Sequence, residues 1–322
     1  MERTLALDIV KVTEAAAIAA ARHMGEGNTE QADAAAVRAM QASMAELAIH
    51  GRIVIGAGKR DEAPMLYVGE EVGGGDGFAV DVAVDPVDGP NIVAKGLPNA
   101  IAIVAVTEKG GILHTPDVYM EKLVVPPQAS GKVDLRWPAE RNLGVLAEAL
   151  GRRISDITVV ILDRPRHADL IAEVRKAGAR IKLISDGDVA PAISAAVSGP
   201  GVQAVMGIGG APEGVLTAAA LRCLGGEIQG RFWYRNDGER QQAKEMGISD
   251  PDRIYRTEDL VRGKSLVFAA TGITDGDLFR GVRLFGGGVR THSLVMTASG
   301  RQIRFVDAIH IQDPSRVGVI RL

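Results

Sequence analysis

Short apolar runs alternate with helical stretches through the second half of this chain. The apolar runs, each long enough for one strand, lie at 157–162, 180–185, 202–208 and 266–270. Stretches with helical periodicity follow the first three, at about 167–177, 188–198 and 213–224. This alternation indicates βαβ units with parallel strands. Ligands bind beyond the carboxyl ends of such strands, so the residues after each run are the first candidates for a site.

The first half of the chain has a different pattern. Residues 4–23 are rich in alanine and helical in periodicity, and Asn28 with Gln31 resembles a capping pair that begins a second helix. Strands are predicted at about 52–55, 79–84, 100–107 and 118–125. We therefore expect two helices against a mainly antiparallel sheet. A Pro-rich connection at 126–138 places the boundary near residue 150, giving an α+β lobe at 1–150 and an α/β lobe at 151–322.

Charge and cysteine content exclude several classes of protein. The 322 residues carry a net charge of -3 and show no basic stripe, so nucleic acid is not an expected partner. One cysteine, Cys223, excludes a disulfide within the chain and a cysteine-based zinc site, which suits a reducing compartment. The longest apolar run near the N-terminus, 15–21, is too short to span a membrane. We expect a cytoplasmic protein without a membrane partner.

The segment DVAVDPVDGPN, residues 81–91, places two acids at the end of an apolar strand. Pro86 and Gly89 predict that the strand stops after Asp85 and turns. Asp85 and Asp88 would then lie close together, and two carboxylates repel each other unless a cation lies between them. Hard divalent cations prefer oxygen ligands of this kind. The alternative is an Asp-rich turn on the surface.

Charged residues follow the predicted strands of the second half. Arg164 and Arg166 flank Pro165, and arginine suits bidentate contact to phosphate, although a solvated charged turn is the alternative. His167 is interpreted as a helix cap or a surface residue, since no second histidine lies at ligand spacing.

Two further loops follow the next strands. Asp186 and Asp188 flank Gly187 and can accept hydrogen bonds from sugar hydroxyls or form an Asx-type turn. The glycines at 207–210 lack the spacing of a dinucleotide fingerprint, and Glu213 instead offers a metal-ligating oxygen. Acids for a metal, arginines for phosphate and acids for hydroxyls together favour metal-assisted hydrolysis of a sugar phosphate.

Eight segments give the chain a family resemblance over nearly its whole length. They are VTEAAAIAA, DEAPMLYVGEEVG, DVAVDPVDG, PDVYMEKL, RPRH, SDGDVA, GIGGAPEGV and ATGIT. The chain resembles a class II fructose-1,6-bisphosphatase of the GlpX type, in the lithium-sensitive sugar phosphatase superfamily. The resemblance implies a layered α-β-α-β-α fold, Mn2+ or Mg2+, a homo-oligomer (dimer or tetramer), and a role in gluconeogenesis and glycerol metabolism. The implied reaction removes the 1-phosphate of fructose 1,6-bisphosphate to give fructose 6-phosphate.

The resemblance also implies roles for individual positions. The implied metal ligands are Asp33, Asp85, Asp88 and Glu213. The implied catalytic residues are Asp61, Asp85 and Asp88. The implied substrate contacts are Asp88, Gly89, Pro90, Tyr119, Arg164, Pro165, Arg166, Asp186, Gly187, Asp188 and Gly210.

Several positions depart from the family pattern. Ala57 and Lys59 stand where the family has glutamates, and Pro90 replaces a threonine whose hydroxyl is thought to position the attacking water. Glu70, Glu71 or a water could substitute for the missing ligand at 57. Three hypotheses therefore stay open: a working phosphatase with an altered metal site, a weakened relative that binds a sugar phosphate, and a phosphatase for another sugar bisphosphate.

Overall fold

The chain divides into two compact units. The computed structural model describes residues 1–57, 66–248, 250 and 252–312. Unit 1 consists of Met1–Val106 with Ser265–Leu322, and unit 2 consists of Thr107–Lys264. This division differs from the predicted boundary near residue 150. The reason is that the strands after residue 265 join the sheet of unit 1, while the strand at 119–125 joins the sheet of unit 2.

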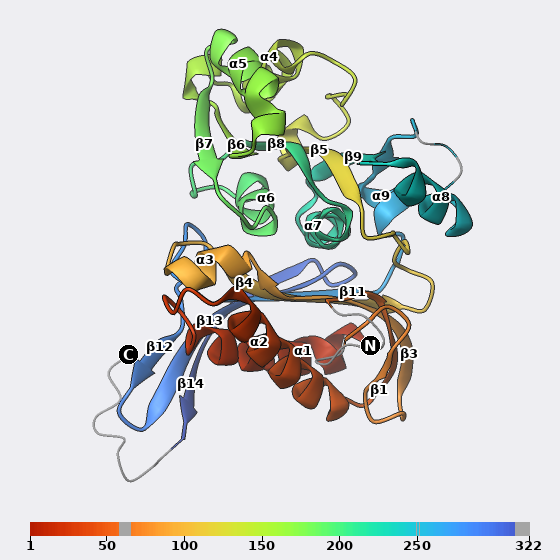
Figure 1. Ribbon diagram of the computed structural model, residues 1–322, viewed down its shortest axis with the longest axis vertical. Coiled ribbons are helices and arrows are strands. Elements are labelled where there is room, and N and C mark those ends of the chain that lie inside the picture. The colour runs from red at the N-terminus through yellow and green to blue at the C-terminus, as the bar shows by residue number, and fades with distance from the viewer. Residues whose placement is uncertain (58–65, 249, 251, 313–322) are drawn as a thin grey trace. The chain divides into compact units, whose positions relative to one another are not determined.

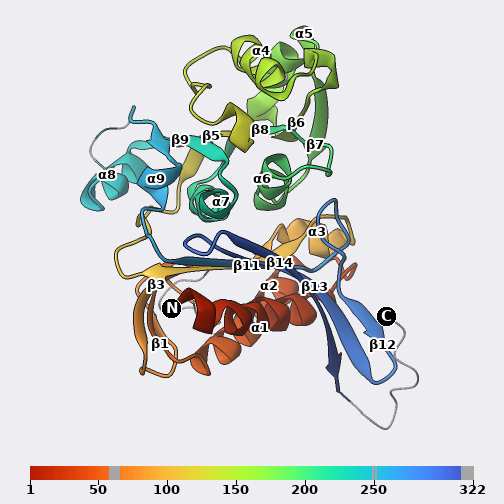
Figure 2. The same cartoon turned by 180° about the vertical axis from the view of Figure 1, so that it is seen from behind.

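Unit 1 contains a mixed sheet of eight strands in its described part, in the order β12-β13-β11-β4-β3-β1-β2, with β14 paired to β13. The strands are β1 (Ile49–Ile55), β2 (Glu71–Val72), β3 (Phe78–Asp88), β4 (Ile101–Glu108), β11 (Leu266–Gly272), β12 (Arg283–Phe285), β13 (Gly288–Thr297) and β14 (Gln302–Ile311). β1 and β3 are parallel, whereas β13 is antiparallel to β11, β12 and β14. The long strands β13 and β14 are seen in Figure 2.

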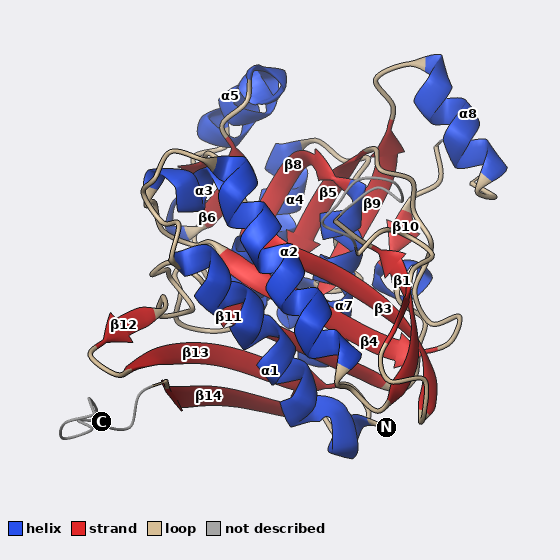
Figure 3. Cartoon of the chain, turned by 60° about the horizontal axis from the view of Figure 1, so that its bottom comes forward, coloured by secondary structure: helices blue, strands red, loops and turns tan. Residues whose placement is uncertain are grey.

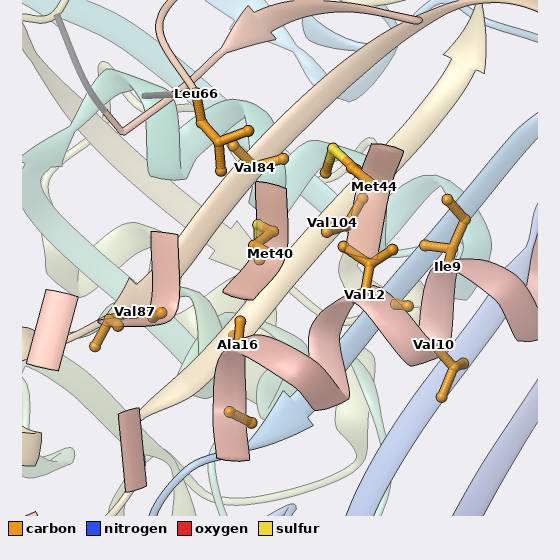
Figure 4. Close-up of a cluster of buried hydrophobic side chains, with 14 of the residues drawn as sticks. Ile9, Val10, Val12, Ala16, Met40, Met44, Leu66, Val84, Val87 and Val104 are labelled. Carbon is orange, nitrogen blue, oxygen red and sulfur yellow. The ribbon is translucent and has the colours of Figure 1, made fainter. Parts of the chain in front are cut away.

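Two long helices, α1 (Glu2–Ala21) and α2 (Thr29–Ala45), run side by side against this sheet (Figure 3), as the sequence predicts. The Asn28 side chain accepts a 3.0 Å hydrogen bond from the Gln31 N–H, so the predicted cap is confirmed. Ile9 and Met40 of the helices are buried with Val84 and Val104 of the sheet (Figure 4). The alanine-rich sequence fits this packing, because small side chains let the helices approach each other closely.

Unit 2 contains a six-stranded sheet in its described part, in the order β10-β9-β5-β8-β6-β7. The strands are β5 (Tyr119–Val125), β6 (Thr158–Leu162), β7 (Arg180–Ile184), β8 (Ala204–Gly210), β9 (Glu227–Trp233) and β10 (Tyr255–Arg256). β6 is parallel to both β7 and β8, which confirms the predicted parallel strands. β5 is antiparallel to β8 and β9, so the sheet is mixed.

Helices cover both faces of this sheet (Figure 1). The helices of unit 2 are α4 (Ala139–Leu150), α5 (Ala168–Lys176), α6 (Val189–Ala196), α7 (Ala211–Leu224), α8 (Asp237–Glu245) and α9 (Thr257–Leu260). α4 and α5 pack on one face around Leu143 and Ile161, and α6 and α7 pack on the other. Both units thus combine a mixed sheet with covering helices, as in the predicted α/β class. None of the helices in the described segments is long and apolar enough to cross a bilayer.

Candidate active site

The acidic stretch of unit 1 lies at the carboxyl end of β3. The prediction that the strand stops after Asp85 is wrong, because β3 continues through Pro86 to Asp88. The Asp85 carboxylate accepts a 3.0 Å hydrogen bond from the N–H of Val87, and Asp88 is only 3% exposed. Gly89 then takes a left-handed conformation with φ of 94°. The two acids therefore belong to a buried strand end rather than to a solvated surface turn.

Pro90 is the first residue of the short helix α3 (Pro90–Lys95). Proline suits this position because its fixed φ matches a helix start and the first helical N–H has no intrahelical partner anyway. The same residue offers neither a hydroxyl nor an N–H to a ligand.

Asp33 is the third acid placed in unit 1 and lies in the first turns of α2, which packs against β3. Its carboxyl is half-buried, and burial raises its pKa above the ordinary value. A nearby cation would reverse this shift by favouring the charged form. Among the residues that the structure describes, no group of three or more His, Cys, Asp or Glu side chains is arranged to hold a metal ion.

The position of the missing glutamate is occupied by an exposed methyl group. Ala57 follows β1 and its N–H donates a 3.1 Å hydrogen bond to the Leu66 carbonyl. Glu70 is already engaged in three hydrogen bonds: Oε1 accepts from Gln41 at 2.7 Å, and Oε2 accepts from the N–H groups of Leu66 and Tyr67 at 2.6 and 3.1 Å. Predicted residues Lys59 and Asp61 lie outside the described residues.

The arginine segment of unit 2 follows β6. Arg166 donates through Nε and Nη2 to the carbonyl of Ile208, at 3.2 and 2.7 Å, and its guanidinium lies 4.8 Å from the centre of the Tyr119 ring. Arg235 lies over the same ring at 5.2 Å. Arg164 donates to the carbonyl of Asp163 at 3.0 Å. Two cations and an aromatic ring are thus gathered at one end of β5, where an anion would be attracted.

His167 occupies the N-cap position of α5, although its side chain makes no cap hydrogen bond, and it is buried rather than on the surface. Only 1% of the residue is exposed. Its Nδ1 lies 2.7 Å from the Leu162 carbonyl, and its Nε2 accepts a 2.7 Å bond from the N–H of Ile208. Nε2 therefore carries no proton, and the ring is the neutral form protonated on Nδ1. Burial lowers the pKa of His167, which favours this neutral form.

An ion pair that the sequence analysis missed joins β5 to the start of α6 in unit 2. Lys122 of β5 contacts Asp188 at the start of α6, with Nζ 2.6 Å from Oδ2. The two side chains are only 3% and 8% exposed. A lysine within the apolar run of β5 was the available signal, because a buried charge requires a partner. The neighbouring Asp186 is half-buried and follows β7.

Glu213 lies in the first turn of α7, directly after the glycines that end β8. Its Oε2 is buried and has no hydrogen-bond partner within the described part of the chain. Burial raises the pKa of Glu213, and the charge of Lys122 opposes that effect. A Cβ on Gly210 would lie 1.8 Å from the same oxygen. The glycine therefore leaves the space that the glutamate occupies.

A scan of protein families matches residues 3–310 to one model, described as bacterial fructose-1,6-bisphosphatase, glpX-encoded. The chain belongs to this family. Similar relatives are named D-fructose 1,6-bisphosphatase class 2/sedoheptulose 1,7-bisphosphatase. The protein of Synechococcus sp. (strain JA-3-3Ab) is 53% identical over 337 positions that cover 97% of each chain. That of Gloeobacter violaceus is 48% identical over 98% of each chain.

The match to the family extends over nearly the whole chain, but the chain is not the same length as all of its relatives. The alignment with the relative from Synechococcus elongatus spans 345 positions and includes all of both chains, at 49% identity. Since this chain has only 322 residues, it lacks residues that the relative has.

Proposed function

We propose that this chain hydrolyses the 1-phosphate of fructose 1,6-bisphosphate and releases fructose 6-phosphate and phosphate. Family membership supports the reaction class. The observation that carries the substrate class is the arrangement of Arg166 and Tyr119 at the end of β5, with buried Asp188 on the loop before α6. Arginine recognises phosphate, and a carboxylate recognises sugar hydroxyls.

The residues of unit 2 bind and orient the sugar phosphate in this proposal. The guanidinium of Arg166 is fixed by two hydrogen bonds to the Ile208 carbonyl, so little side-chain freedom is lost when a phosphate binds. Arg164 is the second cation of the same segment. In this proposal Asp186 and Asp188, which follow β7, accept hydrogen bonds from hydroxyl groups of the sugar.

We further propose that Mn2+ or Mg2+ binds at the carboxylates of Asp33, Asp85 and Asp88 in unit 1 and at that of Glu213 in unit 2. Hard cations of this kind prefer carboxylate ligands. The buried Oε2 of Glu213 and the raised pKa values of Glu213 and Asp33 fit carboxyl groups that are ionised beside a cation. When bound, such an ion polarises the phosphoryl group and offsets its negative charge.

Ala57 and Pro90 predict a low rate rather than another reaction class. Ala57 offers no oxygen, Glu70 is already engaged in three hydrogen bonds, and Pro90 cannot position a water through a hydroxyl. Loss of one positioning group typically lowers kcat by about 10²–10³. Relatives named for sedoheptulose 1,7-bisphosphate make that compound the second substrate to assay.

The test is phosphate release from fructose 1,6-bisphosphate and sedoheptulose 1,7-bisphosphate in the presence of Mn2+. The natural chain is compared with Ala57→Glu/Pro90→Thr and with Asp85→Asn. We expect slow hydrolysis by the natural chain, faster hydrolysis by the double variant, and none above background by Asp85→Asn. Activity in the double variant alone would replace this proposal with a chain that binds the sugar phosphate without turnover.

A further inference from the structure

We propose that Lys122 is a positioning residue that aims the Asp188 carboxylate at a hydroxyl of the sugar. This inference rests on the sugar site of the proposed function and adds a residue to it. Lys122 does not touch the substrate in this proposal. It acts through its ion pair with Asp188, in which Nζ and Oδ2 are 2.6 Å apart.

The ion pair is almost fully buried, where a pair of apolar side chains would stabilise the fold equally well. Lys122 and Asp188 are 3% and 8% exposed, and the strand neighbours Met120 and Val124 on the same face of the sheet are also buried. Replacing a buried ion pair with apolar side chains of similar volume is often neutral or stabilising. An apolar pair would therefore serve the fold as well, so the charge of Lys122 serves the carboxylates it faces: Asp188 through the ion pair, and Glu213, whose pKa it lowers.

The pair changes what an aspartate ordinarily does at this position. Asp188 is the N-cap residue of α6, where an aspartate typically accepts a hydrogen bond from the N–H two or three residues later. Asp188 makes no such cap bond. Its Oδ2 faces Lys122, and its Oδ1 is buried without a hydrogen-bond partner in the described part of the chain. Lys122 thus holds the carboxylate away from the helix and leaves one acceptor oxygen for a ligand.

Gly209 of β8 leaves the space in which this pair forms. A Cβ at Gly209 would lie 2.2 Å from Oδ2 of Asp188 and 3.0 Å from Nζ of Lys122. The backbone at this glycine is not left-handed, so alanine is excluded by the pair and not by backbone strain. A methyl group at 209 therefore displaces the carboxylate without changing any charge, which gives an independent way to test the role of the pair.

The experiment is calorimetric titration of the full-length chain with fructose 6-phosphate in the presence of Mn2+. The variants are Lys122→Met, Asp188→Asn and the double variant. We expect each single substitution to weaken binding about 10- to 100-fold, as for a lost hydrogen bond to a charged group. The double variant should bind no more weakly than Asp188→Asn, because in this proposal the effect of Lys122 on the sugar is transmitted by Asp188. Multiplied losses, or wild-type affinity in Lys122→Met, would overturn the proposal.

The matched control is Arg231→Met. Arg231 pairs with Glu121, the residue before Lys122 on β5, with Nη2 2.6 Å from a carboxylate oxygen, but this pair is about one-third exposed. Its loss should leave the affinity for fructose 6-phosphate within about twofold, since exposed pairs contribute little. An equal loss in Arg231→Met would assign the effect to the strand and not to Asp188.

Gly209→Ala and a crystal structure separate the remaining outcomes. If Lys122→Met does not fold, Gly209→Ala and Lys122→Met/Asp188→Asn still test the role of the pair, with thermal unfolding as the check on the fold. A structure of Lys122→Met should show the Asp188 carboxylate turned to cap α6, and an unmoved carboxylate would overturn the proposal. Absence of binding by the natural chain would instead refute the sugar site of the proposed function.

Discussion

The N–H of Ile208 donates a 2.7 Å hydrogen bond to Nε2 of His167 and so fastens β8 to the segment that follows β6. The opposite ring nitrogen, Nδ1, donates to the Leu162 carbonyl at 2.7 Å. Both bonds require the neutral ring, because a proton on Nε2 would remove the acceptor. The carbonyl of the same Ile208 accepts the two hydrogen bonds of Arg166, so His167 also supports the position of Arg166.

We predict that His167 makes unfolding easier in acid. Burial lowers the pKa of His167 in the folded chain below the value of about 6.5 in the unfolded chain. Its contribution to stability is therefore complete above pH 6.5 and is lost as the pH falls through the folded pKa, because only the unfolded chain takes up the proton. Urea unfolding between pH 8 and 5 should show a smaller loss of stability in His167→Gln. An unchanged pH dependence would contradict this prediction.

The residues just before β2 depend on Glu70. Glu70→Ala removes the acceptor of three hydrogen bonds, from Gln41, Leu66 and Tyr67. We expect the free energy of unfolding to fall by about 1–3 kcal/mol, since Glu70 is 9% exposed and leaves buried donors unpaired. The control is Glu71→Ala at the next, exposed residue, which should stay within about 0.5 kcal/mol of the natural chain. Equal unfolding midpoints for the two variants would refute the structural role of Glu70.

The sequence predicts local elements well and long-range pairing poorly. The parallel strands β6, β7 and β8 and their helices follow from periodicity, because each contains its own pattern. The division into units cannot be predicted from periodicity, because the strands after residue 265 join a sheet with strands from the first third of the chain. The same holds for the pair of Lys122 and Asp188, whose partners are 66 residues apart. The end of β3 was also predicted too early, from the turn-forming residues Pro86 and Gly89. The strand continues to Asp88, and Asp85 accepts a hydrogen bond from the Val87 N–H within it.

Arginine should be required at 166 but not at 164. Arg166 uses two nitrogens on one carbonyl and also stacks on Tyr119, and lysine cannot reproduce this fork. We expect Arg166→Lys to lower kcat/KM for fructose 1,6-bisphosphate at least about tenfold. Arg164→Lys is the matched control and should retain activity within about threefold, because its one bond is to the adjacent carbonyl of Asp163. Similar losses in both variants would show that the fork of Arg166 is not needed.

Gly210 should be irreplaceable because of the glutamate beside it. Its backbone is extended, with φ of -66°, so alanine meets no backbone strain, but a Cβ would lie 1.8 Å from Oε2 of Glu213. Gly210→Ala must therefore displace the Glu213 side chain. We expect the activation of phosphate release by Mn2+ to fall at least about tenfold, since loss of a positioning group typically lowers kcat by about 10²–10³. Gly144→Ala is the control, since nothing lies within 4 Å of a Cβ in that helical position. It should keep full activity and raise the unfolding free energy by about 0.5–1 kcal/mol. Wild-type manganese dependence in Gly210→Ala would show that Glu213 does not act on the metal.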